Sequence, residues 1–316
     1  MSKKLAVIAI GGNSLIIDRQ HQTVRDQYIA AHETCEHIVS MISKGWDVVI
    51  SHGNGPQVGF ILRRSELASH ELHEIPLDVC GADTQGAIGY ALQQNLYNEF
   101  RKLGINRQVT TIVTQVEVSQ DDPSFQKPSK PIGSFMNDRE AKTRIERDGW
   151  NMVKDSNRGW RRVVPSPYPL RIVEEETIKI LLEANVVVIA VGGGGIPVTV
   201  DPSGDLKGIA AVIDKDLTSA LLASNLHADL FIISTAVEKV ALNFGRPDQE
   251  WLNIVSLKEM KAYLAEGIHF AAGSMEPKIE AAIHFLENYG KEVIITNPEN
   301  LEKALAGQTG THIVPD

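Results

Sequence analysis

Glycines directly follow three of the apolar runs in this sequence. They are Gly11 and Gly12 with Asn13, Gly53 and Gly55 with Asn54, and the run from Gly192 through Gly193 and Gly194 to Gly195. Glycine lets a backbone come close to a ligand and present its N–H groups to an anion. One such cluster is compatible with an ordinary turn, but three at equivalent places indicate an anion-binding site. None has the GxxxxGK[ST] spacing of a Walker A loop.

Two lysines are expected in the first turns of helices. Asp214 is a candidate N-cap that places Lys215 in the first turn, and Ser274 with Pro277 does the same for Lys278. A cation at this end of a helix opposes the helix dipole at a cost of about 0.3–1 kcal/mol. Either lysine alone is compatible with a surface position. Together, beside the glycines, they indicate lysines aimed at phosphate groups.

The sequence contains no Ser-His-Asp order, no HExxH motif and no metal-ligand spacing. Phosphoryl transfer depends mainly on positioning and on neutralising the charge of the moving group. An acceptor that is already an anion needs no general base. Asp216 could orient the two lysines or help to hold a metal. Lys130 is a further candidate, although nothing local distinguishes it from an ordinary loop lysine.

Short apolar segments alternate with longer amphipathic ones along the chain. The expected strands are 5–10, 47–51, 108–113, 185–191, 229–234 and 292–296, and the expected helices are 24–43, 57–68 and 82–103. Continuous apolar strands between helices predict an α/β fold, with a parallel sheet covered on both faces. In such sheets ligands bind beyond the carboxyl ends of the strands, which is where the glycines lie.

Residues 116–169 interrupt this alternation. The segment is rich in Pro, Lys, Arg, Asp and Trp, and it is long for a loop. Aromatic residues such as Trp150, Trp160 and Tyr168 favour a packed subdomain with short antiparallel strands over a disordered linker. We therefore expect a small inserted subdomain at 116–169.

Composition narrows the function classes. The chain has 316 residues and a net charge of −9 with no basic cluster, which argues against a nucleic-acid partner. Cys35 and Cys80 form no metal or CxxC spacing and are expected to be reduced, buried thiols. No apolar stretch approaches the roughly 20 residues of a membrane span, and a cytoplasmic protein is expected. A loose GxGxxxG in residues 53–59 keeps an NAD-dependent enzyme as an alternative, although the dinucleotide fingerprint belongs on the first βα unit.

The chain resembles the carbamate kinases of the amino-acid kinase fold over essentially its whole length. The resemblance is carried by AIGGN (9–13), SHGNGPQVG (51–59), TQGAIGY (84–90), KPSKPIG (127–133), RGWRRVVPSP (158–167), GGGGIPV (192–198), AVIDKD (211–216) and HFAAGSMEPKIEAAI (269–283). It implies one domain over 1–316, a three-layer α/β/α sandwich around a mainly parallel eight-stranded sheet, a protruding lid-like subdomain and a homodimer. Residues 1–115 mainly form the carbamate and phosphoryl side, and residues 185–316 the nucleotide side.

The resemblance also implies a reaction, ATP + carbamate ⇌ ADP + carbamoyl phosphate, with magnesium bound mainly through the nucleotide phosphates. It is usually run toward ATP in nitrogen catabolism, of the arginine deiminase or the purine and allantoin type. The implied catalytic residues are Lys130, Lys215, Asp216 and Lys278. The implied carbamate and phosphoryl site consists of Gly11, Gly12, Asn13, Gly53, Asn54 and Gly55. The implied nucleotide site consists of Gly193, Gly194, Asp214, Lys215, Ser234, Ala236, Met275 and Lys278, and no protein metal ligand is expected.

One contrast within the fold favours carbamate as the acceptor. Acetylglutamate kinases carry a lysine just before the first glycine pair, where this chain has Ala9 and Ile10, whereas carbamate kinases supply a lysine from the subdomain, matching Lys130. Three positions depart from the family pattern: Asp83, Asn157 and Ala236. None of the three removes a catalytic lysine, and they leave open a paralogue with shifted efficiency or substrate. The alternatives are a kinase of the same fold for another small carboxylate and a ligand-binding paralogue without catalysis.

Overall fold

The computed structural model describes residues 4–12, 15–16, 20–155, 159–288 and 290–316. The helices are α1 (Val24–Ser43), α2 (Gly55–Ala68), α3 (Leu77–Leu103), α4 (Asp138–Asp148), α5 (Glu175–Glu183), α6 (Lys215–Asn225), α7 (Leu257–Glu266), α8 (Glu276–Glu287) and α9 (Leu301–Leu305). Within the described residues, no helix combines the length and the apolar character that a membrane crossing requires.

The main sheet has eight strands in the order β15-β17-β16-β12-β1-β2-β9-β3. Their bounds are β1 (Lys4–Ile10), β2 (Trp46–His52), β3 (Val109–Thr111), β9 (Val187–Ile189), β12 (Leu230–Ser234), β15 (Ile254–Ser256), β16 (Val293–Thr296) and β17 (Thr311–Val314). Neighbouring strands are parallel except for β16 and β17. The expected mainly parallel, eight-stranded sheet is confirmed.

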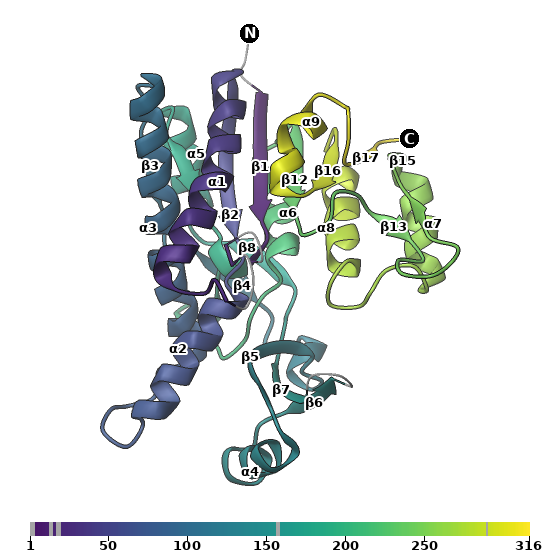
Figure 1. The fold of residues 1–316 in the computed structure, drawn as a ribbon. Helices are drawn as coiled ribbons and strands as arrows, with labels where there is room; N and C mark the ends of the chain where they lie inside the picture. The colour runs from purple at the N-terminus through teal and green to yellow at the C-terminus, as the bar shows by residue number, and fades with distance from the viewer. Residues whose placement is uncertain (1–3, 13–14, 17–19, 156–158, 289) are drawn as a thin grey trace.

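Each central strand sends alternate side chains into two different cores. In β1, Val7 and Ala9 belong to a cluster that includes residues of α5, α6, α7 and α8. Ala6, Ile8 and Ile10 belong to a second cluster, with residues of α1, α3 and α9. Because helices cover both faces of the sheet, its strands are apolar on both sides. The result is a three-layer sandwich (Figure 1).

A smaller unit projects from this body (Figure 1). It consists of α4 and an antiparallel sheet of β5 (Lys130–Met136), β7 (Gly159–Val164) and β6 (Met152–Asp155). The expected short antiparallel strands are therefore present. The ends of the region 116–169 lie in a different, four-stranded sheet, in which β4 (Gln115–Val118) pairs with β8 (Pro169–Ile172) and with β10 (Ile196–Val200), next to β11 (Leu206–Gly208). A hairpin of β13 (Ala241–Leu242) and β14 (Glu250–Trp251) completes the strands described.

The projecting unit is anchored to the body by a small apolar cluster. Ile132 of β5 and Val164 of β7 pack there against Val58 of α2 and against Leu77 and Cys80 of α3. This contact explains why α3 begins at Leu77, five residues before the predicted start at residue 82. Its first turn buries apolar side chains against the projecting unit, although the sequence there contains a proline and a glycine that weaken a helical pattern.

Candidate active site

The glycine loops after β1, β2 and β9 meet at the carboxyl edge of the main sheet. Gly53 N–H donates to the Ile10 carbonyl at 2.8 Å. A Cβ at Gly53 would lie 2.8 Å from Gly12 N, and a Cβ at Gly193, whose φ is +68°, would lie 2.0 Å from the Asn54 amide nitrogen. A side chain at either glycine would therefore displace a neighbouring loop. The prediction that the three clusters form one site is consistent with this geometry.

A cavity of about 280 Å³ opens where these loops meet the first turns of α6 and α8. Its walls contain twelve of the predicted site residues, which are Gly11, Gly12, Gly53, Asn54, Gly55, Lys130, Gly193, Asp214, Lys215, Asp216, Ala236 and Lys278. The sequence segments that supply them are separated by up to 267 positions, from Gly11 to Lys278. The fold thus brings the lysines and the glycines to one place.

Asp214 caps α6, as predicted, and its carboxylate has two functions. Its Oδ1 accepts the Asp216 N–H at 2.9 Å, which satisfies a free donor of the first turn. Its Oδ2 accepts from Lys130 Nζ at 2.5 Å. Lys130 begins β5 of the projecting unit, so this ion pair joins that unit to the start of α6.

Asp216 holds the other two lysines. Lys278 Nζ lies 2.8 Å from Asp216 Oδ2, and Lys215 Nζ donates to Asp216 Oδ1. The three side chains are largely buried. Three ammonium groups therefore face two carboxylates at the positive end of a helix, which leaves an excess of positive charge. Such a site suits a phosphate or another small anion.

The pKa values in this cluster reflect burial and the mutual ion pairs. Burial disfavours the charge of Asp216, but Lys215 and Lys278 outweigh it and hold the pKa of Asp216 well below its usual range. Burial lowers the pKa of Lys215, because the attraction of Asp216 only partly opposes it. Burial also disfavours the charged form of Lys278. The nearby Asp216 carboxylate outweighs this effect and raises the pKa of Lys278. Asp216 thus favours the cationic form of both lysines.

No free general base lines the cavity among the described residues. Its two carboxylates, Asp214 and Asp216, are both engaged by lysines. His52 lies directly beneath the loops, and burial lowers its pKa to about 4, so its ring is neutral at neutral pH. Its Nδ1–H donates to the Gly53 carbonyl at 3.1 Å, and its Nε2 occupies the space that a Cβ at Gly192 would need. We infer that His52 packs the loops together.

Several predicted residues lie elsewhere. Gly194 is buried, and its carbonyl accepts from Thr218 Oγ1 at 2.9 Å; Ser234 is buried at the end of β12. Met275 packs against the first core cluster. None of these three is in the cavity wall. Asn13 and Asn157 lie outside the described residues. Asp83 is exposed on α3 and does not reach the cavity, whereas Ala236 lines it.

One predicted cap is wrong. Ser274 does not cap α8, because the N-cap residue is Met275 and no side chain bonds to the free N–H groups. The carbonyl of Ala271 accepts instead from the N–H groups of Ser274, Met275 and Glu276 at 3.1–3.2 Å. Lys278 nevertheless lies in the first turn, as predicted. Of Ser274, Met275 and Glu276, only Glu276 belongs to α8, so the backbone carbonyl satisfies one N–H group of its first turn.

Two residues of α3 support the loops and were not assigned a role from the sequence. The side-chain amide of Gln85 donates to the Gly192 carbonyl at 3.0 Å and to the Thr114 carbonyl at 3.1 Å, and its oxygen accepts from Thr114 N–H. Thr84 Oγ1 accepts from the Asn54 amide at 2.8 Å. Both residues are in the TQG segment that contributes to the family resemblance. That resemblance is the one feature of the sequence that could have pointed to their role.

Comparison with known proteins identifies the family. Residues 4–297 match the sequence model of the amino acid kinase family. The chain belongs to the amino acid kinase family. It is 50% identical over 317 residues to the carbamate kinase-like protein YahI of Escherichia coli (strain K12), with 99% of each chain covered. It is 47% identical to the carbamate kinase of Pyrococcus horikoshii, with 98% of each chain covered.

Solved structures agree with this membership of the amino acid kinase family. The carbamate kinase from Giardia lamblia bound to AMP-PNP superposes with a TM-score of 0.93 and 40% identity, covering 100% of this chain and 99% of that one. The resemblance seen in the sequence is confirmed. The family and these neighbours indicate a kinase, that is, a phosphotransferase.

Proposed function

We propose that this protein is a carbamate kinase that transfers a phosphoryl group between Mg·ATP and carbamate. The observation that carries the proposal is the arrangement of Lys130, Lys215 and Lys278 around two carboxylates, in the same cavity as the glycine loops. Such a site neutralises a transferring phosphoryl group but supplies no base. Relatives named carbamate kinase at 46–48% identity support carbamate as the acceptor.

In the forward reaction a carbamate oxygen attacks the γ-phosphorus, a P–O bond forms, and the bond to the β-phosphate oxygen breaks. ADP leaves with that electron pair. Carbamate is already an anion, so no proton needs to be removed before attack. The three ammonium groups offset the charge on the phosphoryl oxygens, and the backbone N–H of Gly12, in the same cavity wall, is a candidate additional donor.

The roles of the remaining residues follow from this reaction. Gly11, Gly55 and Asn54 lie with Gly12 and Gly53 on the carbamate and phosphoryl side, for which Asn13 is also expected. The nucleotide occupies the side formed by residues 185–316, near Gly193 and Ala236. We keep Gly194, Ser234 and Met275 as supports of that side, because they are not in the cavity wall. Asp216 acts as a positioning residue for the lysines.

Magnesium enters as part of the nucleotide substrate. The two carboxylates in the cavity wall are occupied by lysines, so the residues present fit a metal held by the nucleotide phosphates better than one held by the protein. We further propose a cytoplasmic homodimer that works toward ATP synthesis, because carbamoyl phosphate is the stronger phosphoryl donor. Such a direction suits nitrogen catabolism of the arginine deiminase or the purine and allantoin type.

One assay tests the proposal. Purified protein is mixed with Mg·ADP and carbamoyl phosphate, and ATP is measured; ATP should form, and Lys215→Ala should form at least about 100-fold less. Acetyl phosphate in place of carbamoyl phosphate tests a kinase for another small carboxylate. Binding of ADP without ATP formation from either donor would instead identify a ligand-binding paralogue. A fluorescence change with NADH but not with ADP would favour a dehydrogenase.

A further inference from the structure

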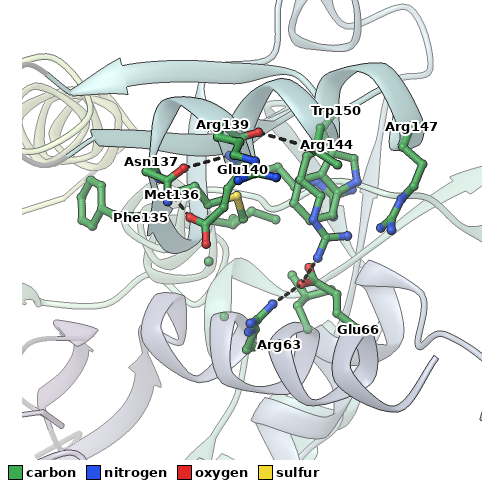
Figure 2. A pocket seen from close by; sticks show the side chains of 16 residues that line it. Arg63, Glu66, Phe135, Met136, Asn137, Arg139, Glu140, Arg144, Arg147 and Trp150 are labelled. Carbon is green, nitrogen blue, oxygen red and sulfur yellow. Dashed lines mark hydrogen bonds and ion pairs between the residues drawn. The ribbon is translucent and has the colours of Figure 1, made fainter. Parts of the chain in front are cut away.

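A second cavity lies beside the candidate active site, between α2 and the projecting unit. Its volume is about 570 Å³, against about 280 Å³ for the first cavity. One wall comes from α2, with Arg63 and Glu66, and the other from β5, α4 and β7. Figure 2 shows the labelled side chains of both walls around one space. Ile132 lines both cavities, so they are adjacent along the same strand.

The walls of this second cavity are strongly basic. Five guanidinium groups line it, from Arg63, Arg139, Arg144, Arg147 and Arg162. Two carboxylates, Glu66 and Glu140, are the acidic residues in its wall. The chain as a whole carries a net charge of −9. A local excess of positive charge on an acidic protein attracts small anions from solution.

Some of these arginines stabilise the cavity itself. Arg144 of α4 contacts Glu66 of α2 at 2.8 Å and Asp148 at 2.8 Å, and Arg147 contacts Asp148 at 2.7 Å. The pair between Arg144 and Glu66 joins the two walls (Figure 2). These contacts fix the shape of the cavity and leave other donors available to a ligand.

The guanidinium groups of Arg139 and Arg162 make no hydrogen bond or ion pair within the part of the chain that the structure describes, although both residues bond through their backbones. The Arg162 guanidinium carbon lies 4.4 Å from the centre of the Trp150 ring, and that of Arg144 lies 4.6 Å from it. Burial lowers the pKa of Arg162 below its ordinary value, which shows that its surroundings disfavour the bare charge. A partly buried guanidinium with unused donors is stabilised by an anion that accepts from it.

We propose that this cavity binds a small organic anion bearing two or more carboxylate or phosphate groups. The volume is within the range of sites for small metabolites. Guanidinium groups match carboxylate and phosphate oxygens in a bidentate way, and stacking on Trp150 holds one of them in a fixed plane. A ligand with at least two anionic groups can contact Arg63 on one wall and Arg139 or Arg162 on the other.

Such a ligand would act on the active site through β5. Lys130 is two residues before Ile132 on that strand, and Ile132 pairs in register with Arg162 of β7. A ligand that bridges α2 and the projecting unit therefore restricts the movement of Lys130 relative to α6. By linkage, its binding and that of carbamoyl phosphate must affect each other. This consequence for catalysis depends on the proposed function, whereas binding itself does not.

Citrate and inorganic phosphate serve as probes in isothermal titration calorimetry with the full-length protein. Tryptophan fluorescence is recorded in parallel, because Trp150 lines the cavity. We expect citrate to saturate and to bind more tightly than phosphate. The double variant Arg139→Gln, Arg162→Gln should bind citrate at least about tenfold more weakly, through loss of two charge-assisted contacts.

Two controls locate the binding. Arg246→Gln removes an exposed arginine from the distant β13–β14 region and should leave citrate affinity unchanged. Lys215→Gln alters the first cavity and should change citrate affinity less than twofold. If the double variant does not fold, Arg139→Gln alone changes an exposed residue and should still weaken binding at least about threefold.

The inference is overturned if neither probe saturates by about 10 mM, or if Lys215→Gln weakens citrate as much as the double variant does. Coupling between the second cavity and the active site is tested separately. Saturating citrate should change the KM for carbamoyl phosphate at least twofold in the wild type and not in the double variant. An unchanged KM in the wild type refutes the coupling. Arginine-dependent binding without any ATP formation would refute the proposed function alone. ATP formation without saturable binding would refute this inference alone.

Discussion

Replacing Asp216 with asparagine tests whether Lys215 and Lys278 act as one charged unit. The variant keeps the size of the side chain and removes the negative charge that the two lysines share. The Lys278 side chain is only 15% exposed and lies 2.8 Å from Asp216. Removing one partner of a buried ion pair costs about 3–5 kcal/mol. We expect the free energy of unfolding of Asp216→Asn to fall by an amount near the lower end of that range, because the amide oxygen still accepts a hydrogen bond.

The pH dependence of this loss follows from the sign of the pKa shift. The folded-state pKa of Asp216 lies below its unfolded value, so its charge stabilises the fold above about pH 4 and ceases to do so as the pH falls through the folded value. The wild type and Asp216→Asn should therefore differ in Tm at pH 7 by about 5–10 °C and converge on acidification. Thermal unfolding followed by circular dichroism at several pH values measures this.

Activity gives a second, independent readout of the same variant. Burial lowers the pKa of Lys215, and Asp216 is the main group opposing that shift. Without Asp216 the Lys215 pKa falls further, so the alkaline limb of the kcat profile should move to lower pH. We also expect kcat at neutral pH to fall by about 100-fold or more, as on losing one oxyanion donor.

The assay measures ATP from Mg·ADP and carbamoyl phosphate between pH 6 and pH 10. Asp83→Asn is the matched control, because it makes the same chemical change on the exposed surface of α3. Its kcat and pH profile should equal those of the wild type. A kcat within threefold of the wild type for Asp216→Asn, with an unmoved alkaline limb, would refute the assignment of Asp216 as the residue that positions the lysines.

Three further predictions concern Lys130, Gly53 and the two cysteines. Lys130→Ala should lower kcat/KM for carbamoyl phosphate about 100-fold and shift Tm by less than about 2 °C, because its ion pair is partly exposed; a Tm loss without an activity loss would contradict this. Gly53→Ala should cost about 1–3 kcal/mol in urea unfolding, since its Cβ would lie 2.8 Å from a backbone nitrogen, whereas the unobstructed Gly86→Ala should not. Burial raises the pKa of Cys80 to about 11 and that of Cys35 further, so a thiol reagent at pH 8 should label both only after unfolding.

The elements that could be predicted from the sequence are those with a strong local pattern. The apolar run 5–10 and the helix 24–43 correspond to β1 and α1 within one residue. Strands β15 and β17 were missed, because they have three or four residues and include polar ones. These segments are strands because they pair with neighbours in the sheet, as β17 does with β16. A local sequence pattern does not reveal such pairing.

The candidate site also combines features with a local sequence pattern and features that depend on long-range contacts. The first-turn positions of Lys215 and Lys278 were predicted from Asp214 and Pro277, which lie at the helix starts as expected, although Ser274 does not cap α8. The pairing of Lys278 with Asp216 joins residues 62 positions apart, and the bond from Gln85 to Gly192 joins residues 107 apart. Contacts of this range depend on the completed sheet. Lys130 was assigned a role through resemblance alone, since its loop contains no local signal.

Asp214 connects the main body of the site to the projecting unit. Its Oδ1 caps α6 and its Oδ2 holds Lys130, so displacement of the projecting unit would break the ion pair and leave the cap intact. Lys130 is also the most exposed of the three lysines, at 28% against 11% for Lys215 and 15% for Lys278. Two lysines are thus held by a buried carboxylate on the body, and the third arrives with β5. Under the proposed reaction, the anionic substrate competes with Asp214 for Lys130, which makes closure of the projecting unit depend on the charge of the ligand.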